Sequence, residues 1–291
     1  MLWDRPAVTI PDDHDVGHPN LWGAGGRKSE RPDGADGGYF FPAAYVNMVQ
    51  RQQTWHLPDP VDPGPVEQGI GVCFTRLVLG GVDFAILEDR KFKTGPFGMI
   101  PKLGPRPDHI LDPASDRAAI DLAGLELLGP RQLAWLTTWA GEWEGVRAKC
   151  ALSQTAFCGA VHLHGEPENR LLADLDSNGW PQSGRNAALR ILKTAKAAHL
   201  CGDQHLAVVV KHGIDAHGDG PWAFTDPADV SDEKQLGDGY GIARWEFAKP
   251  GVGRAVPGTI TFECWPRFPV LVPDGKPQQY PGWPVETSLP E

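Results

Sequence analysis

Three aspartates and a histidine follow directly on a short apolar run near the start of the chain, and this junction constrains the fold strongly. The run, Ala7-Val8-Thr9-Ile10, is rich in β-branched residues and ends at Pro11, which predicts a buried strand. The cluster Asp12-Asp13-His14-Asp15 comes next. Such a concentration of negative charge is costly unless a cation compensates it, and carboxylate and imidazole ligands suit divalent or trivalent metals. A solvated acidic turn is the alternative interpretation.

A second cluster of the same kind, Gly202-Asp203-Gln204-His205, follows a predicted strand at His199 to Cys201. Residues two apart in an extended segment point to one side, so Asp203 and His205 can reach a shared cation, and Gly202 permits close backbone approach. In open α/β sheets, sites gather at the carboxyl ends of strands, where both clusters lie. Two such clusters far apart in sequence are a typical way to assemble a binuclear hydrolytic site.

The remaining patterns predict α/β layers around mixed sheets. Helices are expected over 45–53, from Gly129 onward and over 184–196. Strands are expected over 71–79 and 82–87, joined in a hairpin at Gly80-Gly81, and over 149–154. We also expect 206–211 to be the hairpin partner of 199–201, and antiparallel strands over 240–264.

Composition favours one large ordered domain. Gly 35 and Pro 28 among 291 residues indicate long ordered loops, while 41% hydrophobic residues and 11 Trp supply a sizeable core. No Ser/Gly-rich or single-charge linker divides the chain. We therefore expect a single domain over 1–291, in which 266–291 is a Pro-rich tail that wraps the surface.

Charge, cysteines and motifs exclude several classes of protein. The net charge of −10 is a poor match for nucleic acid, so we expect no sequence-specific nucleic-acid binding, and no apolar run is long enough for a membrane span. The five cysteines lack zinc-knuckle spacing and are expected to be mostly buried free thiols. P-loop, His-Glu-x-x-His and Gly-x-Ser-x-Gly patterns are missing, and the first residues show no signal peptide.

The order and spacing of several blocks resemble the PhoD-like alkaline phosphatases of the calcineurin-like metallophosphoesterase superfamily. This resemblance implies a layered α-β-β-α sandwich of mixed sheets. It covers most of the chain from residue 3 to about residue 265. The blocks that carry it are Trp3 to Asp15, Leu128-Gly129 with Gln132 and Trp135-Leu136, Ser153-Gln154, Asp176 to Arg185, Gly202-Asp203-Gln204-His205 and Asp219-Gly220-Pro221-Trp222.

The resemblance implies a role for each matching residue. Asp13, Asp203 and His205 match metal ligands, and Asn178 stands where many members carry an aspartate ligand. His14 matches the imidazole that stabilises or protonates the leaving oxygen, and Asp15 matches the acid that orients it. Arg90 is a candidate phosphate clamp because a guanidinium binds phosphate oxygens bidentately, and an ion pair with Asp89 or another acid is the equal alternative.

One departure from the family concerns the start of the chain. The superfamily takes its first metal ligands from an early strand–loop block and a Gly-Asp block, both upstream of the acidic–His motif. Here that motif begins at residue 12, so the first strands and these ligands are expected to be missing. The chain then resembles an N-terminally incomplete member, in which loss of ligands removes one metal site and weakens the other.

Two functions follow as hypotheses. The first is a metal-dependent phosphoesterase for phosphomonoesters or phosphodiesters; the resemblance implies Fe³⁺ with Ca²⁺, and Zn²⁺ or Mn²⁺ also fit. The alternative is a catalytically incomplete fragment that acts as a non-catalytic binding module. Export is implied for many members of the family, so secreted or periplasmic and cytoplasmic locations both stay open, as does the oligomeric state.

Overall fold

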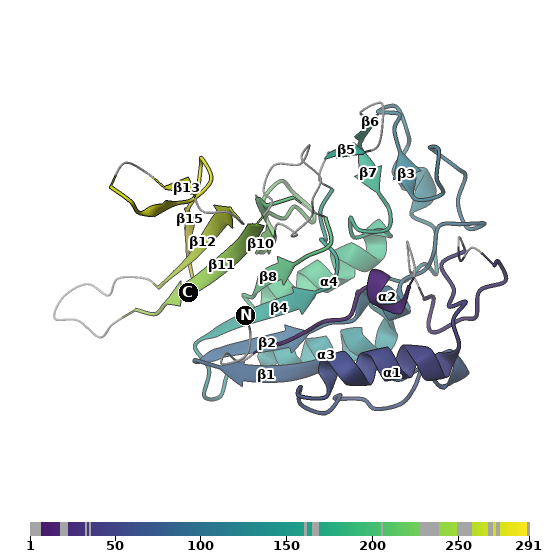
Figure 1. The fold of residues 1–291 in the computed structure, drawn as a ribbon, viewed down its shortest axis with the longest axis horizontal. Helices are drawn as coiled ribbons and strands as arrows, with labels where there is room; N and C mark the ends of the chain where they lie inside the picture. Colours follow the sequence, from purple (N-terminus) through teal and green to yellow (C-terminus); the bar gives the residue numbers. More distant parts are fainter. Residues whose placement is uncertain are drawn as a thin grey trace.

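A six-stranded mixed sheet forms the centre of the computed structural model (Figure 1). The structure describes residues 7–17, 23–32, 34, 36–159, 162–164, 169–204, 206–226, 239–248, 258–266, 270–271 and 274–289. Three adjacent strand pairs in the middle of the sheet are parallel, and the outer pair at each edge is antiparallel. In sheet order the strands are β1 (Thr75–Leu79), β2 (Val82–Ile86), β4 (Ala148–Ser153), β8 (Ala198–Cys201), β10 (Trp222–Thr225) and β9 (Val208–Lys211).

The predicted hairpin between β1 and β2 is confirmed. Gly80 and Gly81 have φ angles of 61° and 84°, which glycine adopts without steric cost and which a two-residue turn of matching twist requires. The turn sets the register in which Leu79 faces Val82. The expected hairpin between 199–201 and 206–211 is wrong, because β10 lies between β8 and β9 and pairs with both.

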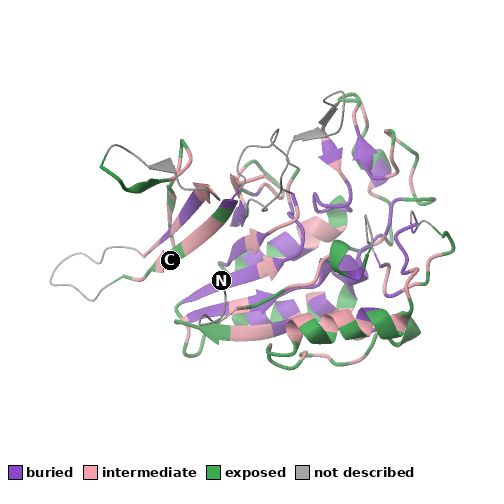
Figure 2. Cartoon of the chain, viewed as in Figure 1, coloured by how far each residue is buried: buried purple, intermediate pink, exposed green. Residues whose placement is uncertain are grey.

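The helices α3 (Gly129–Gly141) and α4 (Gln182–Thr194) cover one face of this sheet, confirming two predicted helices. In α3 the buried residues Gln132, Leu136, Trp139 and Ala140 recur at helical spacing and form a stripe toward the sheet. Ala85 and Ala151 meet them from the strands, where small side chains let the helices approach. Figure 2 shows burial concentrated along the central strands and the adjoining helix faces.

A three-stranded antiparallel sheet packs on the opposite face of the main sheet. Phe224 and Cys150 of the main sheet form one core with Ile260 and Phe262 of the small one. The small sheet contains β11 (Gly239–Glu246), β12 (Thr259–Pro266) and β15 (Val285–Ser288), so the segment expected as a surface tail contributes a paired strand. Among the described residues the layers are helix, sheet, sheet, and the fourth, helical layer of the expected sandwich stays a prediction.

The strand expected over Ala7–Ile10 is wrong. These residues carry no sheet pairing, and Val8 is 40% exposed. The segment passes the carboxyl ends of β4 and β8, lining a groove with Leu152 and Leu200. Both strands already have neighbours on each edge, so no free edge remains for the segment to pair with.

Shorter elements connect these layers. The helix expected over 45–53 is confirmed as α1 (Ala43–Thr54), which packs with Val16, Tyr39 and Ile70. In the described part of the chain, no helix is long and apolar enough to cross a membrane. The remaining elements are η1 (His14–Val16), η2 (Glu67–Gly69), α2 (Asp89–Phe92), β3 (His109–Ile110), η3 (Ala118–Ile120), β5 (His162–His164), β6 (Asn169–Leu171), β7 (Ala173–Asp174), β13 (Val270–Leu271) and β14 (Pro277–Gln278).

All five cysteines are free thiols, and four are buried, as the sequence predicts. Burial raises the pKa of Cys158 and of Cys264 to about 11. It raises the pKa of Cys73, Cys150 and Cys201 still further. Because the thiolate is the reactive form, these side chains are inert packing groups at neutral pH.

Candidate functional site

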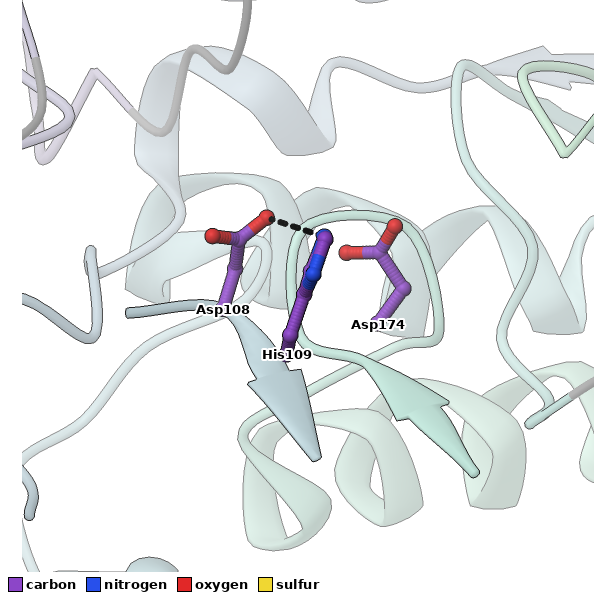
Figure 3. A group of neighbouring side chains, drawn as sticks. All are labelled: Asp108, His109 and Asp174. Carbon is purple, nitrogen blue, oxygen red and sulfur yellow. Dashed lines mark ion pairs between the residues drawn. The ribbon is translucent and has the colours of Figure 1, made fainter. Parts of the chain in front are cut away.

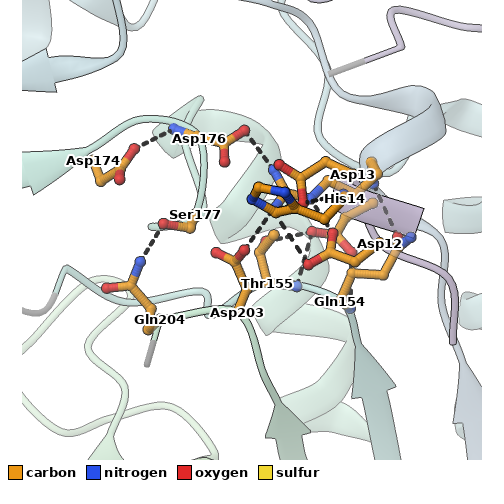
Figure 4. A network of polar contacts seen from close by, with 12 residues as sticks. Asp12, Asp13, His14, Gln154, Thr155, Asp174, Asp176, Ser177, Asp203 and Gln204 are labelled. Atoms are coloured by element: carbon orange, nitrogen blue, oxygen red, sulfur yellow. Dashed lines mark hydrogen bonds and ion pairs between the residues drawn. The ribbon is translucent and has the colours of Figure 1, made fainter. Parts of the chain in front are cut away.

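Arg90 lies at the centre of a group of carboxylates beyond the carboxyl end of β2. It sits in α2 and is only 1% exposed. Its Nε donates to Asp12 Oδ1 at 2.5 Å, its Nη2 to Asp203 Oδ1 at 2.7 Å, and its Nη1 to Asp176. Asp13 Oδ1 lies 3.7 Å from Nη2. Figure 4 shows the four aspartates around a common centre, which we call the carboxylate cluster (Asp12, Asp13, Asp176 and Asp203).

Two neighbouring side chains fix the strand ends around this cluster. The Asp89 carboxylate accepts from the backbone N–H of Gln154 at 3.1 Å and of Thr155 at 3.3 Å, which ties the end of β2 to the end of β4. The Gln154 side chain accepts from the Arg90 N–H at 3.1 Å and donates to the Pro11 carbonyl. The segment that carries Asp12 and Asp13 is therefore attached to the end of the sheet.

The cluster holds more negative charge than Arg90 compensates. Burial, together with the charges of Asp12 and Asp176, raises the pKa of Asp13 to about 8 against the attraction of Arg90. Burial likewise raises the pKa of Asp176 and, more strongly, of Asp203. At Asp12 burial also opposes ionisation, but the charge and hydrogen bonds of Arg90 keep its pKa below the usual value. An additional cation would relieve this repulsion.

The donor atoms fit an oxygen-ligated metal ion. Asp12, Asp13 and Asp203 each offer a carboxylate oxygen, and these atoms lie within 4.8 Å of one another. Carboxylate oxygens are the ligands preferred by Ca²⁺, Mg²⁺ and Mn²⁺. The structure thus brings together Asp13 and Asp203, and it adds Asp12, which the sequence interpretation placed in the acidic cluster without a role of its own, and Asp176, to which it gave no role. The signal for both was present, since each stands in a block that carries the resemblance.

The other two expected metal ligands are Asn178 and His205. The Asn178 side-chain oxygen accepts from the Asp174 N–H at 2.9 Å, while its buried Nδ2 has no hydrogen-bond partner among the described residues. Its amide therefore serves the turn that carries Asp176. His205 lies outside the described residues, and its role as a ligand stays a prediction.

His14 and Asp15 lie at the exposed side of the cluster, in η1. Asp13 Oδ1 accepts from the His14 N–H at 2.9 Å and caps this short helix. The Asp15 carboxylate accepts from Gln53 Nε2 of α1 at 2.6 Å and from the Asp12 N–H at 2.8 Å. These contacts hold the turn on α1, and the expected orientation of the His14 ring by Asp15 stays a prediction.

A second acid–imidazole group lies next to the first, and the sequence interpretation missed it. Asp108, His109 and Asp174 offer ligand atoms within 4.8 Å of one another, and His109 pairs with Asp174 across β3 and β7 (Figure 3). Burial, followed by the charges of Asp176 and Asp108, raises the pKa of Asp174 to about 7. Its Oδ1 accepts from the Asp176 N–H at 3.0 Å, which links the two groups. The adjacent Asp108-His109 pair was the signal available in the sequence.

Comparisons with known proteins show a similarity of fold alone. No family model and no curated protein sequence matches the chain. Among solved structures, a structure of PhoD matches with a TM-score of 0.52 and 13% sequence identity. The match covers 95% of this chain and 50% of the PhoD chain, so this chain spans half the length of that structure. The fold is a mixed α/β arrangement similar to that of PhoD.

Proposed function

We propose that this chain is a metal-dependent phosphoesterase that acts on phosphomonoesters or phosphodiesters. The observation that carries the proposal is the carboxylate cluster, in which two buried aspartates, Asp13 and Asp176, and two half-buried ones, Asp12 and Asp203, share one guanidinium. The similarity of fold to PhoD, which extends over 95% of this chain, supports it. The set of oxygen donors supports a hard cation such as Ca²⁺, Fe³⁺ or Mn²⁺, and Zn²⁺ is also compatible.

In this proposal the residues divide the work of hydrolysis. The proposed metal ligands are Asp13, Asp203, His205 and Asn178. Asp12, which lies in the same group as Asp13 and Asp203, is a further proposed ligand. When bound, the metal supplies hydroxide at neutral pH and neutralises charge on the phosphoryl group. His14, at the exposed side of the cluster, donates a proton from its imidazole nitrogen to the leaving oxygen, and Asp15 holds its turn.

Arg90 can act as a phosphate clamp or as the partner of an ion pair. Its Nε, Nη1 and Nη2 already hold Asp12, Asp176 and Asp203, which is the ion-pair alternative. To act as a phosphate clamp, the guanidinium must exchange a carboxylate for a phosphate oxygen. The same pairing favours a second candidate function, a non-catalytic binding module, because Arg90 already compensates part of the charge.

Hydrolysis of a chromogenic phosphodiester and monoester tests the proposal. The chain is dialysed against chelator, and Fe³⁺, Ca²⁺, Mn²⁺ or Zn²⁺ is added back. We expect metal-restored activity that falls by about 10²–10⁴ in His14→Ala, which lacks the general acid. Asp203→Asn should lose metal affinity by about 10–100-fold, whereas the exposed control Asp274→Asn should retain both properties. Unchanged activity in both site variants would refute the assignment.

Calorimetric titration with the same ions separates the two functions. A phosphoesterase should bind at least one ion, and Asp203→Asn should weaken that binding. If no ion binds to the chelated chain, the metal centre is wrong and the non-catalytic module is favoured.

A further inference from the structure

A groove of about 500 Å³ opens at the end of the main sheet opposite the carboxylate cluster. Its lining includes Ala198 and Trp222, the first residues of β8 and β10. Asp203 of the carboxylate cluster follows the last residue of β8, so the two sites lie at opposite ends of the parallel strands. The C-terminal end of α4 and the strand β15 complete its walls. Its volume lies within the range of small-molecule sites, about 300–1,000 Å³.

The lining of this groove combines an apolar floor with a basic rim. Leu192 and Ile260 belong to the cores on either side of the sheet and lie beneath the groove, while the half-buried Trp222 and Leu289 present apolar surface to it. Three lysines, Lys193, Lys196 and Lys211, line it as well, in a chain whose net charge is −10.

The charges on this rim are only partly compensated. Lys193 pairs with Asp219 at 3.2 Å, and the Lys211 ammonium lies 5.7 Å from the centre of the Trp222 ring. Within the described ranges, neither Lys196 nor Lys211 forms an ion pair with a carboxylate. Two ammonium groups beside an apolar floor are therefore available to an anion.

Lys196 occupies a backbone position that favours glycine. It ends α4 in a Schellman motif, in which its N–H donates to the Lys193 carbonyl at 3.1 Å and the Ala197 N–H donates to the Leu192 carbonyl at 3.0 Å. Its φ angle is +49°, in the left-handed region where such motifs use glycine. Non-glycine residues held there cost stability and cluster at ligand-binding sites. Compared with the glycine usual in this motif, Lys196 places an ammonium group at the rim of the groove.

We propose that this groove binds a free medium-chain acyl anion. The acyl chain lies on the apolar floor formed by Trp222 and Leu289, and the carboxylate lies between Lys196 and Lys211. The apolar floor sits directly beside the ammonium groups, which matches one ligand molecule with a single anionic head. The site is separate from the carboxylate cluster, so its occupancy does not depend on the proposed phosphoesterase activity.

Calorimetric titration of the full chain with decanoate, in buffer with chelator, tests this site. We expect one decanoate per chain, with affinity about tenfold lower in Lys211→Gln and in Lys196→Gly, each of which removes one charged hydrogen-bond donor. Lys102→Gln, an exposed lysine outside the groove, is the matched control and should bind as the parent does. Decanol, which lacks the charge, should bind at least about tenfold more weakly than decanoate.

Lys196→Gly also separates binding from folding. Glycine suits the left-handed position, so the melting temperature of this variant should be equal to or above that of the parent while decanoate binding weakens. Absence of decanoate binding, equal affinity in all variants, or equal affinity for decanol overturns the proposal.

Discussion

At the scale of single residues, four carboxylates share the guanidinium of Arg90, and burial raises the pKa of three of them, Asp13, Asp176 and Asp203, despite its attraction. Asp12 accepts a hydrogen bond from the Arg90 Nε and has a lowered pKa, whereas Asp13 lies 3.7 Å from the nearest guanidinium nitrogen and has a pKa of about 8. An unfolded aspartate has a pKa of about 3.9. Between these two values, folding takes up a proton at Asp13.

This proton determines whether the free energy of unfolding rises or falls with pH. Between about pH 4 and pH 8 the folded chain binds one more proton at Asp13 than the unfolded chain, so the free energy of unfolding falls as the pH rises. We expect the chelated protein to unfold at lower urea concentration at pH 8 than at pH 5. In Asp13→Asn, which cannot titrate at this position, this difference should shrink, and the variant should be the more stable protein at pH 8.

Urea midpoints at both pH values, for both proteins, provide the measurement. Asp274→Asn, an exposed acid near the C-terminus, is the control and should keep the slope of the parent. Identical pH slopes in the parent and in Asp13→Asn would contradict the assignment of the raised pKa to Asp13.

At the scale of elements, the buried stripe of α3 stabilises its packing against the main sheet. Leu136 is fully buried in the core between α3 and the main sheet, while Leu133, one turn earlier, is only half-buried against it. Leu136→Ala should lower the free energy of unfolding by about 2–5 kcal/mol, because it leaves a cavity in a close-packed core. Leu133→Ala should cost clearly less. Denaturant titration of both variants checks this, and equal losses would show that the stripe is not the packed face.

The same elements show what the sequence can predict and where prediction stops. The hairpin at Gly80-Gly81 and the helices α1, α3 and α4 depend on local patterns, and these predictions are confirmed. The partner of β9 depends on β10, which follows it in the chain, so the expected pairing with β8 is wrong. Ala7–Ile10 has the composition of a strand but meets no free strand edge.

Part of the candidate site, too, could be predicted from local sequence patterns, and part could not. Strand-end acids are visible in sequence, and Asp13 and Asp203 do lie together. The pairing of Arg90 with Asp176, and the cross-strand meeting of His109 with Asp174, depend on how distant segments pack. No local pattern contains that information.

At the scale of the whole molecule, the two sheets share one core. The rings of Phe224 and Phe262 lie 5.4 Å apart across the layers, those of Phe84 and Trp245 lie 5.9 Å apart, and Arg147 lies 3.8 Å above the ring of Phe247. The single domain stays a prediction, and if it holds, the layers joined by these contacts unfold together.

Phe262→Ala tests this cooperativity. The side chain is fully buried, so its removal should cost about 3–5 kcal/mol. If the layers form one unit, far- and near-ultraviolet circular dichroism should report a single transition at a lower temperature. Tyr240→Ala, at a 51% exposed position in the same small sheet, should change the transition little. Two separate transitions in Phe262→Ala would instead show that the small sheet unfolds by itself.

The buried thiols allow local opening of the fold to be measured. Cys73 precedes β1, Cys150 lies in β4, Cys201 ends β8 and Cys264 lies in β12, so each layer of strands contains a thiol that is silent while it stays closed. An alkylating reagent can modify each one only when its own surroundings open. The rates of modification, resolved by peptide, would therefore rank the parts of the protein by the free energy of their local opening, with no label introduced into the chain.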